Sequence, residues 1–202
     1  MQIIRKVLTA CFFSALTYVP LASATIINGS FEANTQANGT WNIYSNLVGW
    51  TGGPYGIELR NNVAGQAYDG VNYIELDTTH NSAASQIIGT ILGQSYLVAF
   101  AYSPRTGVAT GSNGIEVFWN NISQGIFSGT GGSNGSNNWS LMTLNVIGGA
   151  PTSTLRFQAV GTDDSYGGSL DAVSVTSVPE PGTLMLLGIG LAGLGFARRK
   201  KA

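Results

Sequence analysis

Apolar and polar residues alternate with a period of two in many short stretches of this chain, the pattern of β-strands with one buried face. Ile74 and Leu76 alternate with side chains that can face water, and so do Leu155, Phe157 and Ala159. Turns rich in Gly, Asn and Ser separate the runs, and no window keeps a helical period. The pattern predicts strands at Thr25–Asn28, Gly56–Arg60, Tyr73–Thr78, Ser85–Ile88, Ser95–Tyr102, Ile115–Asn120, Gly125–Ser128, Trp139–Val146, Thr154–Val160 and Ser169–Thr176. Short strands of this kind predict an all-β fold, an antiparallel two-sheet β-sandwich of the jelly-roll type.

The N-terminal stretch departs from this alternation. Arg5 and Lys6 precede an uncharged, mainly apolar run from Val7 to Leu21, and Ala22-Ser23-Ala24 follows it. A positive region, an apolar region and an A-x-A site are the three parts of a secretory signal peptide. We therefore expect residues 1–24 to form a signal helix that signal peptidase removes after Ala24.

The C-terminal stretch is also continuously apolar. The sixteen residues from Gly182 to Ala197 carry no charge, and the four cations 198–201 follow them. As a helix this run would be about 24 Å long, which is short for a bilayer, but the Arg and Lys stems can reach the headgroups. A buried globular helix with a basic tail is the alternative, and it would keep one polar face, which this run lacks. We expect a transmembrane helix with its positive end in the cytoplasm.

Three features of this segment occur together: Pro179-Glu180-Pro181, the glycine-rich apolar run and the terminal Arg/Lys cluster. In this combination the segment resembles the PEP-CTERM sorting signal of Gram-negative bacteria. The resemblance implies recognition by a membrane exosortase, cleavage near Pro179, Glu180 and Pro181, and transient anchoring in the inner membrane. It predicts an exported protein of the cell envelope, cell surface or exopolysaccharide of a biofilm. We divide the chain into a signal peptide (1–24), a sandwich domain (25–177) and a sorting segment (178–202).

Charge and cysteine content exclude several classes of function. The part between the two apolar ends has three arginines, no lysine and nine carboxylates, hence a net charge of −6. Such a surface disfavours nucleic acid as a partner. The only cysteine, Cys11, lies in the expected leader, so the exported chain has no disulfide, cysteine nucleophile or cysteine-based zinc site.

Short motifs along the predicted sandwich suggest its family. They are Ile27-Asn28-Gly29-Ser30-Phe31-Glu32, Asn72-Tyr73-Ile74-Glu75-Leu76-Asp77, Gly93-Gln94-Ser95-Tyr96 leading to Phe100, and Leu170-Asp171-Ala172-Val173-Ser174-Val175. In this order they resemble galactose-binding-like jelly rolls used as carbohydrate-binding modules. The resemblance implies a β-sandwich, and glycan binding is one of the many functions that this fold carries.

Residues that could catalyse a reaction are few. His80 is the only histidine and lies in a polar turn, and no Gly-x-Ser-x-Gly nucleophile motif occurs. Glu58, Glu75 and Asp77 could supply the carboxylate pair of an exported glycoside hydrolase. The favoured interpretation is that they are polar, outward positions of alternating strands, which Arg60 and Arg105 neutralise. We expect a non-enzymatic protein and keep the hydrolase as the alternative.

Glycan binding would use aromatic faces for sugar C–H groups and forked polar groups for hydroxyls. Trp50 and Trp119 are expected to fill the core, whereas Trp41 and Tyr44 could face either the core or a ligand. The candidate glycan-binding residues are Trp41, Tyr44, Glu58, Arg60, Glu75, Asp77 and Arg105. A polysaccharide is the expected partner, and a purely structural surface protein, with no aromatic-lined face, is the remaining option.

A metal site is predicted from topology. Jelly rolls bring their first and last strands together, which would place Glu32 near Asp171, and two such carboxylates repel each other unless a cation or a proton intervenes. The resemblance to sugar-binding jelly rolls also implies a structural Ca²⁺. We expect Asn28, through its carbonyl, Glu32 and Asp171 as ligands, and no other cofactor.

Overall fold

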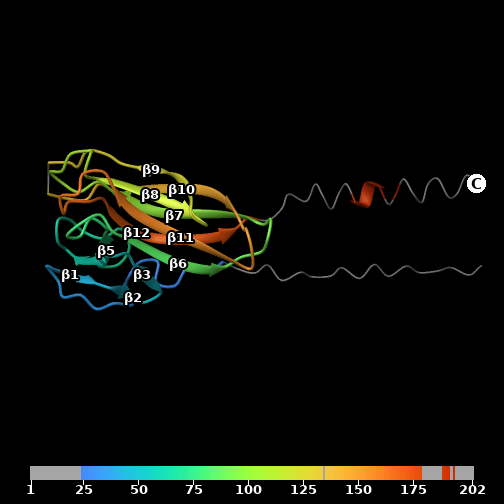
Figure 1. The fold of residues 1–202 in the computed structure, drawn as a ribbon, viewed down its shortest axis with the longest axis horizontal. Helices are drawn as coiled ribbons and strands as arrows, with labels where there is room; N and C mark the ends of the chain where they lie inside the picture. The colour runs from blue at the N-terminus through green and yellow to red at the C-terminus, as the bar shows by residue number, and fades with distance from the viewer. Residues whose placement is uncertain (1–23, 134, 179–187, 192, 194–202) are drawn as a thin grey trace, which may run out of the picture.

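The computed structural model describes residues 24–133, 135–178, 188–191 and 193. Two six-stranded antiparallel sheets face each other in this part of the chain and form a β-sandwich (Figure 1), which confirms the predicted fold class. The strands are β1 (Thr40–Tyr44), β2 (Asn46–Leu47), β3 (Trp50–Gly52), β4 (Ile57–Asn61), β5 (Asn72–Glu75), β6 (Ala83–Gly89), β7 (Ser95–Ser103), β8 (Gly114–Trp119), β9 (Ile122–Phe127), β10 (Ser140–Ile147), β11 (Thr152–Val160) and β12 (Ser169–Ser177).

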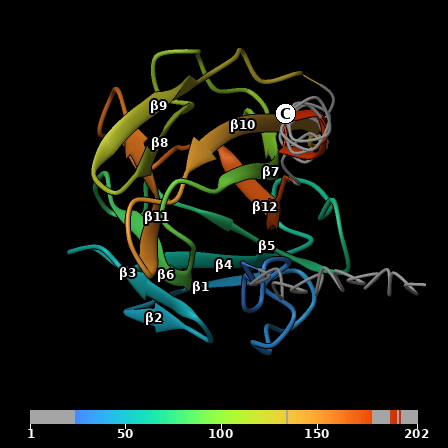
Figure 2. The same ribbon diagram turned by 90° about the vertical axis from the view of Figure 1, so that its right-hand side faces the viewer.

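Each sheet contains strands from the early, middle and late parts of the chain. The first sheet has the order β1-β4-β5-β12-β7-β10, and the second has the order β2-β3-β6-β11-β8-β9. Figure 2 shows both layers from one end of the sandwich. Because β4 and β5 pair directly, with Glu58 opposite Glu75 and Arg60 opposite Tyr73, polar residues of one parity gather on the outer face of the first sheet.

The core lies between the sheets and is built from the inward residues of each strand. In β11 every second residue is buried, as the alternation predicts. Phe31 contacts Trp50, Trp50 contacts Phe157, and Phe157 contacts Phe100, with ring centroids 5.1 to 6.2 Å apart. Trp50 and Trp119 are 1% and 4% exposed, which confirms that they fill the core.

Two sequence predictions about strands are wrong. Thr25–Asn28 is not a strand: Ile27 exchanges both backbone hydrogen bonds with the side chain of Gln86, and Asn28 has a φ of 55°. The sequence also missed β1, β2 and β3, which lie in a stretch rich in Gly, Asn and Pro that lacks clear alternation. The other predicted strands overlap observed ones, although β5 ends at Glu75 and not at Thr78.

Both ends of the described sandwich lie at the same end of the molecule, where the coloured ribbon begins and ends in Figure 1. There the backbone N–H of Val178 donates to the carbonyl of Ser95 at 2.9 Å. The predicted signal helix, most of the sorting segment, and Pro179, Glu180 and Pro181 fall outside the described residues. Residues 188–191 and 193 are helical. In the described ranges no helix has the length and apolar character needed to span a bilayer.

Candidate functional site

A cluster of four charged side chains lies on the outer face of the first sheet. Arg60 of β4 contacts Glu58 of the same strand through Nε at 2.5 Å. Its Nη1 lies 2.7 Å from Oε2 of Glu75 on β5, an ion pair without hydrogen-bond alignment. Arg105, in the loop after β7, places Nη1 3.1 Å from the other oxygen of Glu75. Two carboxylates and two guanidiniums therefore compensate one another.

This cluster is buried although it faces outward from the sheet. The side chains of Glu58, Arg60 and Glu75 are 5%, 3% and 0% exposed. The loop before β12 covers them: the backbone N–H of Gly167 donates to Glu75 at 2.8 Å, and Arg105 donates to the carbonyl of Ser165. Outward parity was predicted from the sequence, whereas burial under a loop was not.

Burial and neighbouring charges act against each other in the cluster. Burial raises the pKa of Glu75 to about 7, although Arg60 and Arg105 act to lower it. Burial acts to lower the pKa of Arg60, but the charges of Glu75 and Glu58 outweigh it and raise that pKa above its ordinary value. Arg60 is therefore a fixed cation, and the carboxylates on both sides of it carry the compensating charge.

A pocket of about 210 Å³ opens beside the cluster. It is lined by Trp41, Glu58, Arg60, Val63, Thr78, Arg105, Ser165 and Tyr166. Trp41 of β1 lies opposite Arg60 in the sheet and is 53% exposed, and Tyr166 is 48% exposed. The guanidinium of Arg105 lies 4.5 Å above the Tyr166 ring, so this side of the pocket combines an aromatic face with hydrogen-bond donors.

The structure brings together five of the seven candidate glycan-binding residues. Four of them line the pocket, and Glu75 lies beneath it, held by both arginines. Tyr44 lies elsewhere: it packs against the core and its hydroxyl donates to Gln36 at 3.0 Å. Asp77 is fully buried beyond the end of β5, where it accepts the backbone N–H of Asp164 and burial raises its pKa.

Sequence reasoning missed four residues of the pocket: Val63, Thr78, Ser165 and Tyr166. Tyr166 carried a usable signal, because it is an aromatic residue in a loop rich in Asp, Ser and Gly, much as Trp41 lies in a stretch of Asn and Gly. Val63, Thr78 and Ser165 carried none.

The carboxylates proposed for hydrolysis do not form an open pair. Arg60 lies between Glu58 and Glu75 and contacts both. Asp77 is held by a backbone amide of the loop before β12. His80 pairs instead with Asp163, 2.9 Å from its Nδ1, and both side chains are about half exposed.

The expected calcium ligands Glu32 and Asp171 bind one shared loop. Asp171 accepts the backbone N–H groups of Tyr68 and Asp69 at 2.8 and 2.9 Å. Glu32 accepts the backbone N–H groups of Val71 and Asn72 at 2.8 and 2.6 Å. The carbonyl of Asn28 accepts hydrogen bonds from the Trp50 indole and from a backbone N–H. The first and last segments therefore bring both carboxylates to the 68–72 loop.

The electrostatics of these two carboxylates suit a cation. Burial, together with the charge of Asp69, raises the pKa of Asp171 to about 7, although the backbone hydrogen bonds that this carboxylate accepts act to lower it. Within the described part of the chain neither Glu32 nor Asp171 has an ion-pair partner. That part holds no group of three or more His, Cys, Asp or Glu side chains placed for a metal, so any ion here would need backbone carbonyls as further ligands.

Comparison with known proteins identifies the C-terminal segment. Residues 177–201 match the PEP-CTERM protein-sorting motif, which confirms the resemblance noted in the sequence. A motif of this kind implies an exported protein of the cell envelope. The chain is also 29% identical, over 153 residues, to the multifunctional-autoprocessing repeats-in-toxin protein of Vibrio cholerae serotype O1. That match covers 75% of this chain but only 3% of the toxin.

Two solved structures have a similar fold. The Stig cyclase FisC from Fischerella sp. TAU is 13% identical, with a TM-score of 0.59 over 79% of this chain and 100% of the cyclase. A family 35 carbohydrate-binding module from Clostridium thermocellum is 18% identical, with a TM-score of 0.47 over 69% of this chain and 99% of the module. At 13% identity the likeness to the cyclase concerns the fold alone.

Proposed function

We propose that this chain is an exported envelope protein whose sandwich binds a glycan without catalysis, and that its C-terminal segment holds it at the inner membrane until an exosortase removes that segment. The sorting motif at 177–201 supports the route. The uncharged run from Gly182 to Ala197, closed by four cations, supports membrane retention.

The observation that carries glycan binding is the pocket between Trp41 and Tyr166. Its exposed aromatic rings can stack on the C–H faces of a sugar, while Glu58, Arg60 and Arg105 offer acceptors and donors to hydroxyl groups. A volume of about 210 Å³ is below the roughly 300 Å³ at which pockets for drug-sized ligands begin, so it suits one sugar unit of a longer chain.

The charge of the pocket favours a neutral sugar. Above the pKa of Glu75, at about 7, both Glu58 and Glu75 are ionised and compensate Arg60 and Arg105, so no net positive charge is left to attract a uronic acid or a sulfated sugar. The same compensation argues against a hydrolase. A glycosidase needs two carboxyl groups about 5–10 Å apart across an open cleft, whereas Arg60 occupies the space between these two.

Trp41→Ala should lower the affinity for a bound neutral glycan about tenfold or more, because stacking on an exposed ring is lost while the buried ion cluster stays intact. Binding of residues 25–177 to a glycan array, followed by titration calorimetry, measures this effect. Tyr55→Ala is the matched control, since Tyr55 is 45% exposed and lies outside the pocket lining. Equal loss in both variants would place glycan binding outside this pocket, and binding to no glycan would point to a purely structural sandwich.

We also propose a structural Ca²⁺ at Glu32 and Asp171, with backbone carbonyls of the adjoining loops completing its shell. Saturating calcium should raise the melting temperature by about 5–10 °C, because an ion at about 100 times its Kd stabilises the native state by about 2.7 kcal/mol. Asp171→Asn should abolish the increase, whereas Asp163→Asn should keep it. Differential scanning calorimetry with calcium or with a chelator measures both. An unchanged melting temperature in the parent chain would refute the site.

A further inference from the structure

The end of the sandwich at which the described chain begins and ends carries no charged residue in its loops. The segments 24–30, 89–94, 120–121, 148–151 and 174–178 contain no Asp, Glu, Lys or Arg. Three of these segments bond to one another: Gln94 donates to the carbonyl of Val178 at 2.6 Å, the backbone N–H of Gly93 donates to the carbonyl of Gly148, and the N–H of Gly148 donates to the carbonyl of Gln94. Asp163 lies in the loop between β11 and β12, at the opposite end of these strands, and the ion cluster lies on the outer face of β4 and β5.

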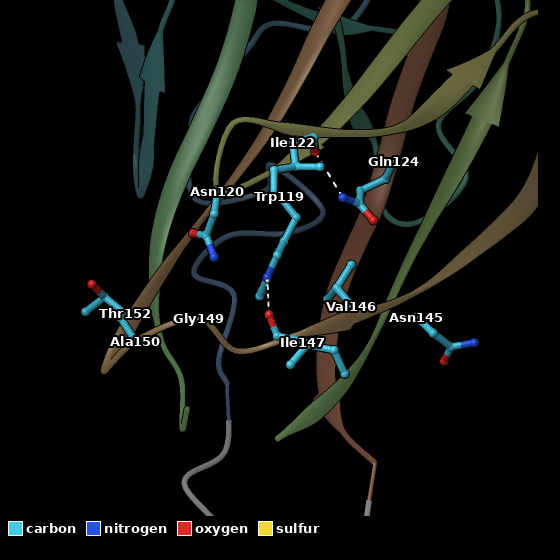
Figure 3. Close-up of a pocket in the computed structure, with 10 residues that line it drawn as sticks. All are labelled: Trp119, Asn120, Ile122, Gln124, Asn145, Val146, Ile147, Gly149, Ala150 and Thr152. Carbon is cyan, nitrogen blue, oxygen red and sulfur yellow. Dashed lines mark hydrogen bonds between the residues drawn. The ribbon is translucent and has the colours of Figure 1, made fainter. Parts of the chain in front are cut away.

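Large apolar side chains project from this uncharged end. Leu92, Ile122 and Ile147 are 73%, 67% and 55% exposed, and Val178 is 38% exposed. We call these four residues the apolar rim. A second cavity, of about 590 Å³, opens between the two sheets beside Ile122 and Ile147, with Val146 on its wall (Figure 3).

Trp119 lines this cavity, and its indole nitrogen already has a hydrogen-bond partner. Its indole N–H donates to the carbonyl of Ile147 at 2.8 Å, drawn as the dashed line between Trp119 and Ile147 in Figure 3. The surface that the cavity presents is therefore mainly hydrocarbon, from Trp119, Ile122, Val146 and Ile147, with amide side chains at its edge. Its lining includes no charged side chain.

We propose that the apolar rim lies against the outer face of a phospholipid bilayer as long as the C-terminal segment remains attached. This inference rests on the membrane retention included in the proposed function. Only residues 179–181 separate Val178 from the uncharged run that begins at Gly182, and three residues span about 10 Å when fully extended. A run embedded in the bilayer therefore holds the rim within reach of the headgroups.

The distribution of charge supports a bilayer as the occupant. The sandwich carries a net charge of −6, and an anionic membrane repels acidic side chains near its surface. The rim and its loops contain none, so this end can approach without that repulsion, and exposed Ile and Leu side chains can insert at the interface. The expected leader ends at the same end of the sandwich, so both apolar ends of the precursor would hold the same surface toward the membrane.

This orientation has a consequence for the glycan pocket. β7 runs from Ser95 at the rim to Ser103 near Arg105, nine residues that span about 30 Å. The pocket would therefore face away from the bilayer as long as the C-terminal segment remains attached.

Fluorescence quenching in vesicles tests this contact. The full-length chain with Cys11→Ser has no thiol, so one cysteine placed at Leu92 or at Leu141 can carry an environment-sensitive dye. Leu141 is the matched control, an exposed leucine that lies opposite Ala101, near the far end of β7. The chains are incorporated into vesicles of about three parts phosphatidylethanolamine to one part phosphatidylglycerol, with a nitroxide quencher on the acyl chains.

We expect the lipid quencher to reduce emission at position 92 by about twofold or more and to leave position 141 unchanged. With the dye at Ile122, the double substitution Leu92→Glu and Ile147→Glu should remove the quenching while the chain still floats with the vesicles. Chains that float but show equal quenching at 92 and 141 would refute the rim contact and leave membrane retention standing. Chains that do not float would refute both, and glycan binding by residues 25–177 would be unaffected. Protection of position 92 that grows with protein concentration without vesicles would show instead that a second copy covers the rim.

Discussion

Arg60→Met should lower the free energy of unfolding by about 4 kcal/mol. Arg60 is 3% exposed and is the cation between Glu58 and Glu75, so its removal leaves two buried carboxylates facing each other. Arg105 can still compensate Glu75, but Glu58 loses its only ion-pair partner among the described residues. Urea unfolding of residues 25–177, followed by tryptophan fluorescence, measures the change.

Two further variants separate charge burial from lost packing. Arg156→Met removes an arginine that is half-buried and stacks over Phe118 at 3.9 Å, and it should cost about 1 kcal/mol or less because no carboxylate is left unpaired. Adding Glu58→Gln and Glu75→Gln to Arg60→Met should restore about half of the lost stability, because the uncompensated charges are gone. If the triple variant is no more stable than Arg60→Met, charge burial is not the cause.

The strands in which apolar and polar residues alternate with a period of two could be predicted from the sequence. Inward Leu155, Phe157 and Ala159 require a partner sheet, and strands with one apolar face favour the antiparallel sandwich that is observed. β1 escaped prediction because it is only five residues long and lies in a stretch rich in Gly, Asn and Pro, and because its apolar residues Trp41 and Ile43 lie on the outer face of the sheet, opposite Arg60 and Glu58. A strand at the edge of a sheet packs against fewer neighbouring side chains, so its alternation of apolar and polar residues is weaker.

The candidate site was predictable where it depends on strand parity. Glu58, Arg60 and Glu75 converge because they share the outer face of two paired strands. Tyr44 is three residues after Trp41 on β1, and therefore points to the opposite face, into the core. Asp77 has the same parity as Glu75, but β5 ends before it. The backbone of Asp77 instead forms an isolated antiparallel β-bridge with Asn81.

The remainder of the site depends on contacts between distant segments. Gly167 covers Glu75 from 92 residues away in the sequence, and Arg105 reaches it from 30 residues away. Loops have no periodicity from which such closure could be derived. For the same reason the sequence showed that Glu75 faces outward but not that it is buried, and burial is what raises its pKa and makes Arg60 indispensable.

The N-terminal segment closes the sandwich without being a strand, and Gly29 is what allows it to do so. The carbonyl of Gly29 accepts the backbone N–H of Val173 on β12 at 2.9 Å. A Cβ at Gly29 would overlap the carbonyl oxygen of Val173. The segment has no room to shift, because Phe31, two residues later, is fully buried and packs on Trp50 with centroids 5.6 Å apart.

Gly29→Ala should therefore lower the free energy of unfolding by about 3 kcal/mol, since either the β12 contact or the Phe31 anchor must be displaced. Gly89→Ala is the matched control: a Cβ there has no heavy atom within 4 Å, and its effect should stay within about 0.5 kcal/mol. Denaturant unfolding of residues 25–177 compares the two variants. Equal stability would mean that residues 25–32 contribute little to the sandwich, and the calcium site at Glu32, which depends on the same docking, would then lose its structural basis.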